Sequence, residues 1–349
     1  MKRILIVILV FVAVAALLGG CENKTGGNET VTAPVSETAG APDKDSEDSQ
    51  PQTLPTTIRI GGLRGATSMG MVKLLKDAGE GKTFNSYDFL LAGSADEITP
   101  KLISGELDIA AVPANLASVL YNNTGGKVKL LAINTLGVLY IVEKGETIKE
   151  FADLRGKTIY ATGRGSAPEY VLYYLLEANG LDPEKDITIE WKSEPSEVVS
   201  LMAQNQGSIA MMPQPYVTVA QGAIEDLRIA ADLTREWERL DTGSMLLTGV
   251  LVVRTGFADE YPGQIEKFLT EYRESTDFVN ANIAEAAVLI EEFDIFKAAV
   301  AEKALPFCNI TFYAGQEMKA AMQGYLQVLF DRNPQSVGGT LPDDNFYYG

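Results

Sequence analysis

Histidine is absent from the 349-residue sequence. Ser–His–Asp and Cys–His catalysis, His-ligated zinc and His-dependent iron chemistry therefore lose their usual central residue. Carboxylates or lysines remain available as acids and bases. Gly163-Arg164-Gly165 lacks the third glycine of a dinucleotide loop, and the Gly61–Ser68 turn lacks the lysine of a phosphate-binding loop. We predict no catalytic residue, no cofactor and no metal site.

Basic residues are also scarce. The chain has 29 lysines and arginines against 47 aspartates and glutamates, which gives a formal net charge of −18. Proteins hold nucleic acids through clustered lysines and arginines, and anionic lipid surfaces attract basic patches. The composition therefore argues against a nucleic-acid partner and against docking on a membrane through a basic surface.

The N-terminus carries the one notable apolar run. Ile4–Leu18 is apolar throughout, but a membrane-spanning helix needs roughly 20 residues. The run follows Lys2 and Arg3 and ends at Leu18-Gly19-Gly20-Cys21, the pattern of a secretory signal before a lipidated cysteine. We expect residues 1–20 to be a signal peptide and Cys21 to carry a lipid that anchors the protein to the outer face of the cell membrane. An uncleaved membrane anchor is the alternative.

Cysteine is limited to Cys21 and Cys308. If Cys21 is lipidated, no intramolecular disulfide can form, so stability outside the cytoplasm must come from the core. Residues 21–55 are rich in Thr, Ser, Gly, Pro and acidic residues, with hardly an aliphatic side chain. Such a segment buries too little apolar surface to fold, so we predict a disordered tether.

From Thr56 onward, apolar strands alternate with helical periods. This alternation predicts an α/β fold with mostly parallel sheets covered by helices on both faces. The predicted strands are 57–62, 89–92, 107–113, 128–134, 157–162, 186–191, 208–212 and 227–231, and the predicted helices are 68–78, 96–104, 115–121, 169–178, 196–204 and 216–224. The segment 262–332 is predicted to be helical and to pack on the first lobe.

A repeat divides this region into two similar halves. Ile109-Ala110-Ala111-Val112-Pro113 returns one hundred positions later as Ile209-Ala210-Met211-Met212-Pro213, and Arg64-Gly65-Ala66 returns as Arg164-Gly165-Ser166. The similar segments 137–143 and 249–254 are predicted to be strands that cross between the halves. We expect residues 56–142 and 250–349 to form lobe 1 and residues 143–249 to form lobe 2.

Ligands of open α/β sheets bind outside the carboxyl ends of the strands. In this chain those ends lead into helix N-termini, which favour electron-rich groups. The candidate ligand-binding residues are Arg64, Gly65, Ala66, Thr67, Ser94, Ala95, Pro113, Asn115, Arg164, Gly165, Ser166, Ala167, Gln214 and Tyr216. Thr67, Ser94, Asn115 and Ser166 could equally be helix caps.

The charge of the ligand stays open at this point. Arg64 and Arg164, one from each half, could close on one carboxylate or sulfonate through charge-assisted hydrogen bonds, or both could be solvated loop residues. Tyr216 is the best candidate for aromatic stacking. A cleft lined by Tyr216 and methionines would suit a neutral heteroaromatic ligand as well as Arg64 and Arg164 would suit an acid.

Three stretches resemble one known family. They are Asp153-Leu154-Arg155-Gly156-Lys157, Gly105-Glu106-Leu107-Asp108-Ile109-Ala110, and Gly163–Gly180 followed by Leu181-Asp182-Pro183. They are similar to substrate-binding proteins of ABC importers, in the group that binds nitrate, alkanesulfonates, taurine or thiamine-precursor pyrimidines. The family often has an acidic residue before proline at the start of a lobe-2 helix, and here that place is Pro213-Gln214-Pro215.

The resemblance implies a two-lobed type II periplasmic-binding-protein clamshell, with two crossover strands as its hinge. It also implies a monomer without catalysis that delivers a small sulfonate, carboxylate or pyrimidine-like ligand to an ABC permease and its ATPase. The alternatives are a surface lipoprotein that binds another protein, and a histidine-independent enzyme that uses the same cleft.

Overall fold

The computed structural model describes residues 53–204 and 209–349. The predicted signal peptide, Cys21 and residues 21–52 of the predicted tether lie outside the described residues. Thr53–Thr56 lead into the first strand without regular structure, and the carbonyl of Leu54 accepts a hydrogen bond from Gln264 Nε2 at 2.8 Å. No helix in the part of the chain that the structure describes is long and apolar enough to cross a membrane.

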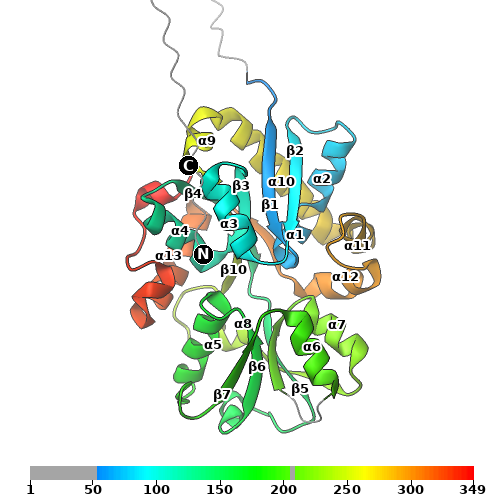
Figure 1. Ribbon diagram of the computed structural model, residues 1–349, viewed down its shortest axis with the longest axis vertical. Helices are drawn as coiled ribbons and strands as arrows, with labels where there is room; N and C mark the ends of the chain where they lie inside the picture. Colours follow the sequence, from blue (N-terminus) through cyan, green and yellow to red (C-terminus); the bar gives the residue numbers. More distant parts are fainter. Residues whose placement is uncertain (1–52, 205–208) are drawn as a thin grey trace, which may run out of the picture. The chain divides into compact units, whose positions relative to one another are not determined.

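Two sheets organise the described residues, one in the upper and one in the lower half of the ribbon (Figure 1). The six-stranded sheet has the order β11-β4-β10-β3-β1-β2, and the five-stranded sheet has the order β7-β6-β8-β5-β9. We call the sheets with their covering helices lobe 1 and lobe 2. The strands are β1 (Thr57–Leu63), β2 (Ser86–Ala92), β3 (Ile109–Pro113), β4 (Val128–Leu136), β5 (Leu139–Lys144), β6 (Thr158–Thr162), β7 (Thr188–Lys192), β8 (Ile209–Pro213), β9 (Leu227–Asp232), β10 (Leu247–Arg254) and β11 (Ile310–Tyr313).

The two sheets share one topology, apart from the extra edge strand β11. In lobe 1, β1 is parallel to β3 with Ile60 opposite Ile109, and in lobe 2, β6 is parallel to β8 with Ile159 opposite Ile209. Each sheet also receives one antiparallel strand from the crossover segments: β10 pairs with β3, and β5 pairs with β8. The residue-level repeat therefore reflects equivalent strands, and the predicted two-lobed α/β fold with crossover strands is confirmed.

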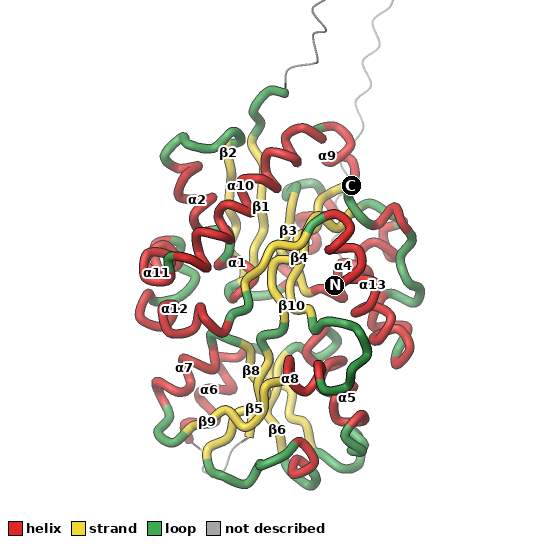
Figure 2. Tube along the Cα trace, turned by 180° about the vertical axis from the view of Figure 1, so that it is seen from behind, coloured by secondary structure: helices red, strands yellow, loops and turns green. Residues whose placement is uncertain are grey.

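Helices cover both faces of each sheet, as the apolar strands require. On lobe 1, α2, α10, α11 and α12 lie on one side of the sheet, and α4 and α13 lie on the other (Figure 2). On lobe 2, α5 and α8 are separated by the sheet from α6 and α7 (Figure 1). The helices are α1 (Ala66–Met69), α2 (Val72–Gly79), α3 (Ala95–Ser104), α4 (Ala114–Thr124), α5 (Ala167–Ala178), α6 (Pro195–Gln204), α7 (Tyr216–Ala223), α8 (Leu233–Glu238), α9 (Thr255–Glu260), α10 (Pro262–Ala281), α11 (Ile283–Glu292), α12 (Ala298–Ala304) and α13 (Gly315–Arg332).

Strand β3 shows how two cores form around one sheet. Ile109 and Ala111 belong to the apolar cluster that includes α2 and α10, whereas Ala110 and Val112 belong to the cluster that includes α3, α4 and α13. All four are buried, since successive side chains of a strand point to opposite faces. Cys308 lies in a third cluster beside α11 and α12, where burial raises the pKa of its thiol to about 12.

Two predictions of secondary structure are wrong in detail. The predicted helix 68–78 is divided into α1 and α2, because Gly70 lies so close to α10 that its carbonyl accepts a hydrogen bond from Ser275 Oγ at 2.7 Å. A Cβ on Gly70 would lie 3.0 Å from the Ile310 side chain. The predicted all-helical segment 262–332 contains β11, a four-residue edge strand that pairs with β4. Helices α10 and α13 do pack on lobe 1, as predicted.

Each sheet buries one carboxylate that is paired with arginine. Asp108 accepts hydrogen bonds from Arg59 Nε at 2.8 Å and from Arg254 Nη2 at 2.8 Å, and Glu143 accepts one from Arg228 Nη2 at 2.6 Å. Burial alone would raise the pKa of both carboxyl groups. Their hydrogen bonds outweigh burial and hold both pKa values below the ordinary range. Both carboxylates are therefore ionised, compensated parts of the fold.

Candidate functional site

Two cavities lie where the carboxyl ends of strands in both lobes meet the crossover segments. The first, called here the Arg64 cavity, has a volume of about 290 Å³. Residues from β1 and its following loop, from the β7–α6 connection, from the start of α7 and from both crossovers line it. They are Leu63, Arg64, Gly65, Ala66, Thr67, Gly93, Val138, Glu194, Pro195, Pro213, Gln214, Tyr216 and Thr248.

The second cavity, called here the apolar cavity, has a volume of about 170 Å³. Aliphatic and proline side chains from both lobes make up most of its wall, together with four hydroxyl-bearing residues. The lining residues are Leu63, Thr67, Pro113, Leu139, Thr162, Ser166, Ala167, Pro168, Val171, Pro213, Leu247 and Thr248. Leu63, Thr67, Pro213 and Thr248 line both cavities, so the two cavities adjoin.

Arg64 lines the first cavity but directs its guanidinium to a turn of its own lobe. Nη1 donates to the carbonyls of Asp294 and, at 3.3 Å, of Ile295, and Nη2 lies 3.4 Å from the Asp294 carboxylate. Asp294 has a positive φ of 55°, and the backbone N–H of Ile295 donates to the carbonyl of Ile290, which closes the C-terminus of α11 as a Schellman motif. Arg64 thus stabilises the turn that leads to Phe296.

Tyr216 packs against Phe296 across the two lobes. Their ring centroids are 5.2 Å apart with an interplanar angle of 80°, an edge-to-face contact. Burial raises the pKa of Tyr216. Tyr216 begins α7 of lobe 2, whereas Phe296 directly follows the turn held by Arg64. The predicted aromatic residue therefore lies at the cavity and also joins the lobes.

Arg164 and Gly165 are placed differently. Both are exposed and line neither cavity, although Ser166 and Ala167, which follow them, line the apolar cavity. The Ser166 hydroxyl donates to the carbonyl of Gly163 at 2.8 Å. The structure therefore brings only the first of the two predicted arginines to a cavity wall.

Glutamates of their own helices hold the N–H groups at three of the helix starts. Glu97 Oε1 accepts from the N–H of Ser94 and of Gly93, both at 3.1 Å. Glu169 Oε2 accepts from the N–H of Gly165 at 2.6 Å, and Glu197 Oε2 accepts from the N–H of Ser193 at 3.2 Å. These carboxylates accept from N–H groups at or just before the start of each helix, and they place negative charge at the N-termini of α3, α5 and α6.

Four further candidates are Ser94, Ala95, Asn115 and Gln214, and one of them, Gln214, lines a cavity. Ser94 is exposed at the start of α3, and neither it nor Ala95 lines a cavity. Asn115 is buried, and its Nδ2 donates to the carbonyl of Ser336 at 2.9 Å, which ties α4 to the C-terminal segment. Gln214 lines the Arg64 cavity, and its Oε1 caps α7 by accepting from the backbone N–H of Thr218 at 3.3 Å and from the Thr218 hydroxyl at 2.9 Å.

Sequence reasoning missed the crossover residues Val138, Leu139, Leu247 and Thr248. The rule that ligands bind outside the carboxyl ends of strands does not predict Thr248 as a site residue, because Thr248 lies near the start of β10. Because β10 is antiparallel to β3, with Gly249 opposite Pro113, its beginning lies at the carboxyl edge of its neighbour. The prediction that β10 crosses between the lobes was the available signal. The β7–α6 connection with Glu194 and Pro195 follows the rule directly and was overlooked.

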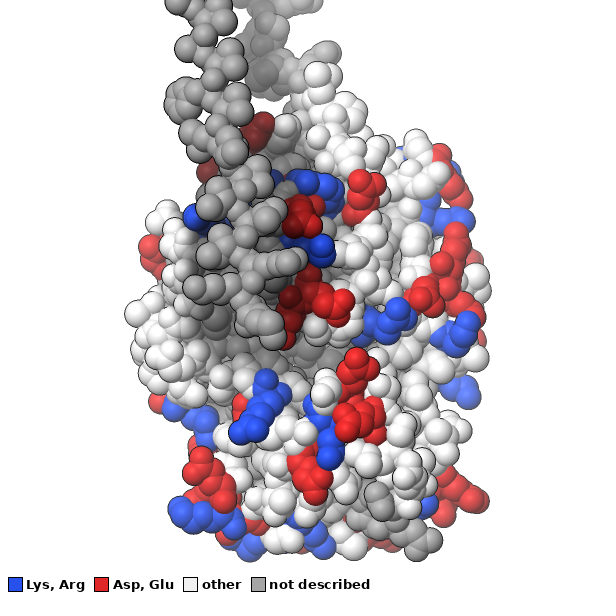
Figure 3. All heavy atoms as spheres, viewed as in Figure 1, with Lys and Arg blue, Asp and Glu red and all other residues white. Residues whose placement is uncertain are grey.

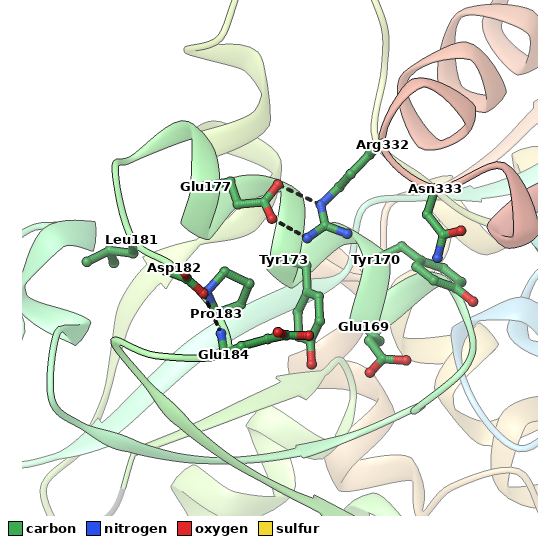
Figure 4. A pocket seen from close by; sticks show the side chains of 10 residues that line it. All are labelled: Glu169, Tyr170, Tyr173, Glu177, Leu181, Asp182, Pro183, Glu184, Arg332 and Asn333. Carbon is green, nitrogen blue, oxygen red and sulfur yellow. Dashed lines mark hydrogen bonds and ion pairs between the residues drawn. The ribbon is translucent and has the colours of Figure 1, made fainter.

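A larger surface hollow, of about 730 Å³, lies between α5, the following turn and the end of α13 (Figure 4). Four carboxylates line it, and Arg332 reaches from lobe 1 to Glu177 of lobe 2 through two hydrogen bonds (Figure 4). The Arg332 guanidinium also lies 5.2 Å from the centre of the Tyr173 ring. This hollow contains an ion pair that joins the lobes. Of the predicted ligand residues, none lines it.

Acidic and basic side chains are interspersed over the visible face (Figure 3). Within residues 53–204 and 209–349, no group of three or more acidic or cysteine side chains is arranged to hold a metal ion.

Comparison with solved structures identifies the fold. The chain shares 24% identity with an ABC transporter protein from Parabacteroides distasonis, at a TM-score of 0.70, covering 85% of this chain and 99% of that one. The aliphatic sulphonate binding protein SsuA from Escherichia coli is 17% identical, with a TM-score of 0.67 and coverage of 82% and 96%. The nitrate-binding protein NrtA from Synechocystis PCC 6803 is 16% identical, with a TM-score of 0.58 and coverage of 80% and 82%.

No curated protein matches the chain. A family model does: residues 82–302 match the family described as "ABC transporter, phosphonate, periplasmic substrate-binding protein". This match includes β2 to β10, and so both crossovers and the whole of lobe 2. The structural neighbours have the same two-lobed architecture. The chain belongs to this family of periplasmic substrate-binding proteins of ABC transporters.

Proposed function

We propose that the protein is a lipid-anchored, monomeric receptor that closes its two lobes on a small organic ligand and delivers it to an ABC permease. Members of this family bind small ligands for import and are not themselves enzymes. The observation that carries the proposal is the pair of adjoining cavities whose walls come from both lobes and from both crossovers. A ligand that contacts both lobes favours the closed state by its differential contacts.

The dimensions of the cavities support a small ligand. A volume of about 290 Å³ beside one of about 170 Å³ suits a compact organic molecule rather than a peptide or a polymer. Sulfonates, carboxylates and pyrimidine-like compounds are the candidate classes. Thermal-shift measurements against these classes, followed by small-angle X-ray scattering, test the proposal. We expect at least one compound to raise the melting temperature and to reduce the radius of gyration. If no compound of a broad panel changed the melting temperature, this result would contradict the proposed receptor function.

The anchor is tested separately through Cys21. We expect the full-length chain to be found in the membrane fraction and the Cys21→Ala variant to be released from it, since removing the thiol removes the site of the lipid. Cys308→Ala is the matched control, because Cys308 is buried in the fold. Membrane retention of the Cys21→Ala protein at its original length would instead indicate an uncleaved N-terminal anchor.

A further inference from the structure

We infer that the lobes open on one flank only: α7 moves away from α12, while α5 and α8 stay packed against α4 and α13. The contact between Tyr216 and Phe296 is then a latch that forms when the lobes close. This inference rests on the proposed receptor function and names the side from which the ligand enters. It is carried by the different apolar packing of the two flanks and by the position of the two cavities between them.

The lobes meet along two flanks, and on the first, called here the α5–α13 flank, one apolar core runs from lobe 1 into lobe 2 (Figures 1 and 2). A single cluster of buried side chains includes α4 and α13 of lobe 1 together with α5 and α8 of lobe 2. Trp237 of α8 and Tyr325 of α13 are both fully buried, and their ring centroids are 5.9 Å apart. Separation of the lobes here would expose large apolar surfaces to water, which strongly disfavours opening on this flank.

The outer edge of the α5–α13 flank adds charged and aromatic contacts. Arg332 at the end of α13 donates two hydrogen bonds to the Glu177 carboxylate of α5 (Figure 4). The same guanidinium lies 5.2 Å from the centre of the Tyr173 ring, within the range of a cation–π contact. These contacts therefore cover the rim of an interface whose interior is already apolar.

On the second flank, called here the α7–α12 flank, the apolar clusters of the two lobes are separate. Among the described residues, the cluster of α6 and α7 contains none from lobe 1, and the cluster of α11 and α12 contains none from the helices of lobe 2. The edge-to-face pair of Tyr216 and Phe296, both partly exposed, bridges this flank. So does a hydrogen bond of 3.4 Å from the Tyr140 hydroxyl to the carbonyl of Phe307. These contacts can break without exposing a core.

Arg64 prepares the half of the latch that belongs to lobe 1. Its guanidinium donates to the carbonyls of Asp294 and Ile295 and so holds the turn directly before Phe296. Its side chain is 40% exposed, so Arg64 can hold this turn and face the cavity at the same time. Tyr216, the first residue of α7, is the half carried by lobe 2. The Phe296 half is therefore in place before Tyr216 reaches it.

The two cavities lie toward different flanks. Glu194, Pro195 and Tyr216, at the starts of α6 and α7, line the Arg64 cavity, which therefore lies toward the flank that opens. Ala167 and Val171 of α5 line the apolar cavity, and Val171 belongs to the cluster that joins the lobes. A ligand therefore enters through the Arg64 cavity, the apolar cavity forms the inner end of the site, and the latch closes behind the ligand.

Distances between pairs of nitroxide labels measure the two flanks separately, without a ligand. Gln221→Cys in α7 with Glu302→Cys in α12 reports on one flank, and Ala178→Cys in α5 with Gln323→Cys in α13 reports on the other; all four positions are exposed. Double electron–electron resonance is recorded on the full-length chain in lipid nanodiscs. The chain without added cysteines is the labelling blank, because Cys308 is buried. We expect a short and a long distance for the α7–α12 pair, and one narrow distance for the α5–α13 pair.

Variants of the latch shift the balance between the two α7–α12 distances. Tyr216→Ala should raise the ratio of long to short distance about fivefold, since it removes an aromatic pair. Arg64→Ala should raise the same ratio, because the turn before Phe296 loses its donors. Tyr216→Phe keeps the ring and should leave the ratio unchanged. Tyr173→Ala is the matched control: it removes an aromatic contact between the lobes on the α5–α13 flank, and it should leave both label pairs as in wild type.

Three results would overturn the inference. A second distance for the α5–α13 pair, in wild type or in Tyr173→Ala, would show that the lobes separate on both flanks. A single α7–α12 distance in wild type and in both latch variants would show that this flank does not open. Equal ratios in wild type, Tyr216→Ala and Arg64→Ala would refute the latch. None of these results decides the receptor function, which stands or falls with the ligand-induced changes in melting temperature and radius of gyration.

Discussion

Lobe 1 and lobe 2 share one sheet order, but their equivalent loops after the first strand have different roles. After β1, Arg64 lines a cavity and holds the turn before Phe296. After β6, Arg164 is exposed, and Ser166 and Ala167 behind it line the apolar cavity. The shared sheet order therefore places the equivalent loops of both lobes beside the cavities, but the residues of these loops have different roles. The loop after β1 holds a turn through Arg64, whereas the loop after β6 contributes residues to the apolar cavity.

A substitution in a crossover strand is expected to have the largest effect on ligand binding between the lobes. Thr248 on β10 lines both cavities and is not fully buried, so a large side chain there fills the cleft with little damage to the core. We expect Thr248→Trp to weaken ligand binding about 100-fold, the equivalent of overpacking by about 3 kcal/mol. Isothermal titration measures the effect. Thr248→Val is the control and should bind within a factor of about three of wild type, since at most one weak hydrogen bond is lost.

The two buried carboxylates extend the comparison to stability. Asp108 has two arginine partners and one backbone N–H, that of Arg59, whereas Glu143 has one arginine together with Thr147 and two backbone N–H groups. We expect Asp108→Asn to lower the free energy of unfolding by about 3 kcal/mol, because it leaves two guanidinium groups without their counter-charge. Glu143→Gln should cost about 2 kcal/mol. Urea unfolding followed by circular dichroism measures both, and equal losses would contradict the proposed difference.

These carboxylates also give the stability a defined pH dependence. The folded protein holds both pKa values below the ordinary range. Their contribution is therefore complete above the unfolded pKa values of about 4 and is lost as the pH falls through the lower folded values. We expect wild type to lose stability more steeply than Asp108→Asn below about pH 4. Parallel acid curves for the two proteins would show that Asp108 does not contribute in this way.

The arginines test the difference between the lobes directly. Arg64→Ala removes donors from the turn before Phe296, so we expect every ligand, charged or not, to bind about tenfold more weakly. Arg164→Ala should change affinity by less than a factor of about two, because an exposed residue without a structural role contributes little. Titration of both variants with one uncharged and one anionic ligand shows whether Arg64 acts by stabilising the turn or by contacting an anion directly. A selective loss of anion binding by Arg64→Ala would support the latter.

The smallest expected effect concerns the aromatic contact between the lobes. Tyr216→Ala should weaken ligand binding about fivefold, since an edge-to-face pair contributes about 0.5–1.5 kcal/mol. Tyr216→Phe keeps the ring and should bind like wild type. Loss of affinity in Tyr216→Phe as well would indicate that the hydroxyl, rather than the contact with Phe296, is what matters.

The sequence predicts the strands and the duplicated halves well, because apolar runs and the 109–113 and 209–213 repeat are local patterns. It does not predict the break at Gly70, which depends on the approach of α10 from two hundred positions away. The role of Arg64 likewise depends on Asp294, which lies far along the chain. The role of Glu97 and Glu169 at the helix starts could have been predicted from the sequence. Ser94-Ala95-Asp96-Glu97 and Ser166-Ala167-Pro168-Glu169 both have the Ser-x-x-Glu capping pattern.

Small-angle X-ray scattering tests most directly the claim that two lobes close around a guest. The measurement compares wild type and Thr248→Trp, each with and without the compound that most raises the melting temperature of wild type. The account predicts that the radius of gyration of wild type decreases on ligand addition and that the variant does not respond. Tight binding to wild type with no change in scattering, or the same compaction in the variant, would contradict closure around these cavities.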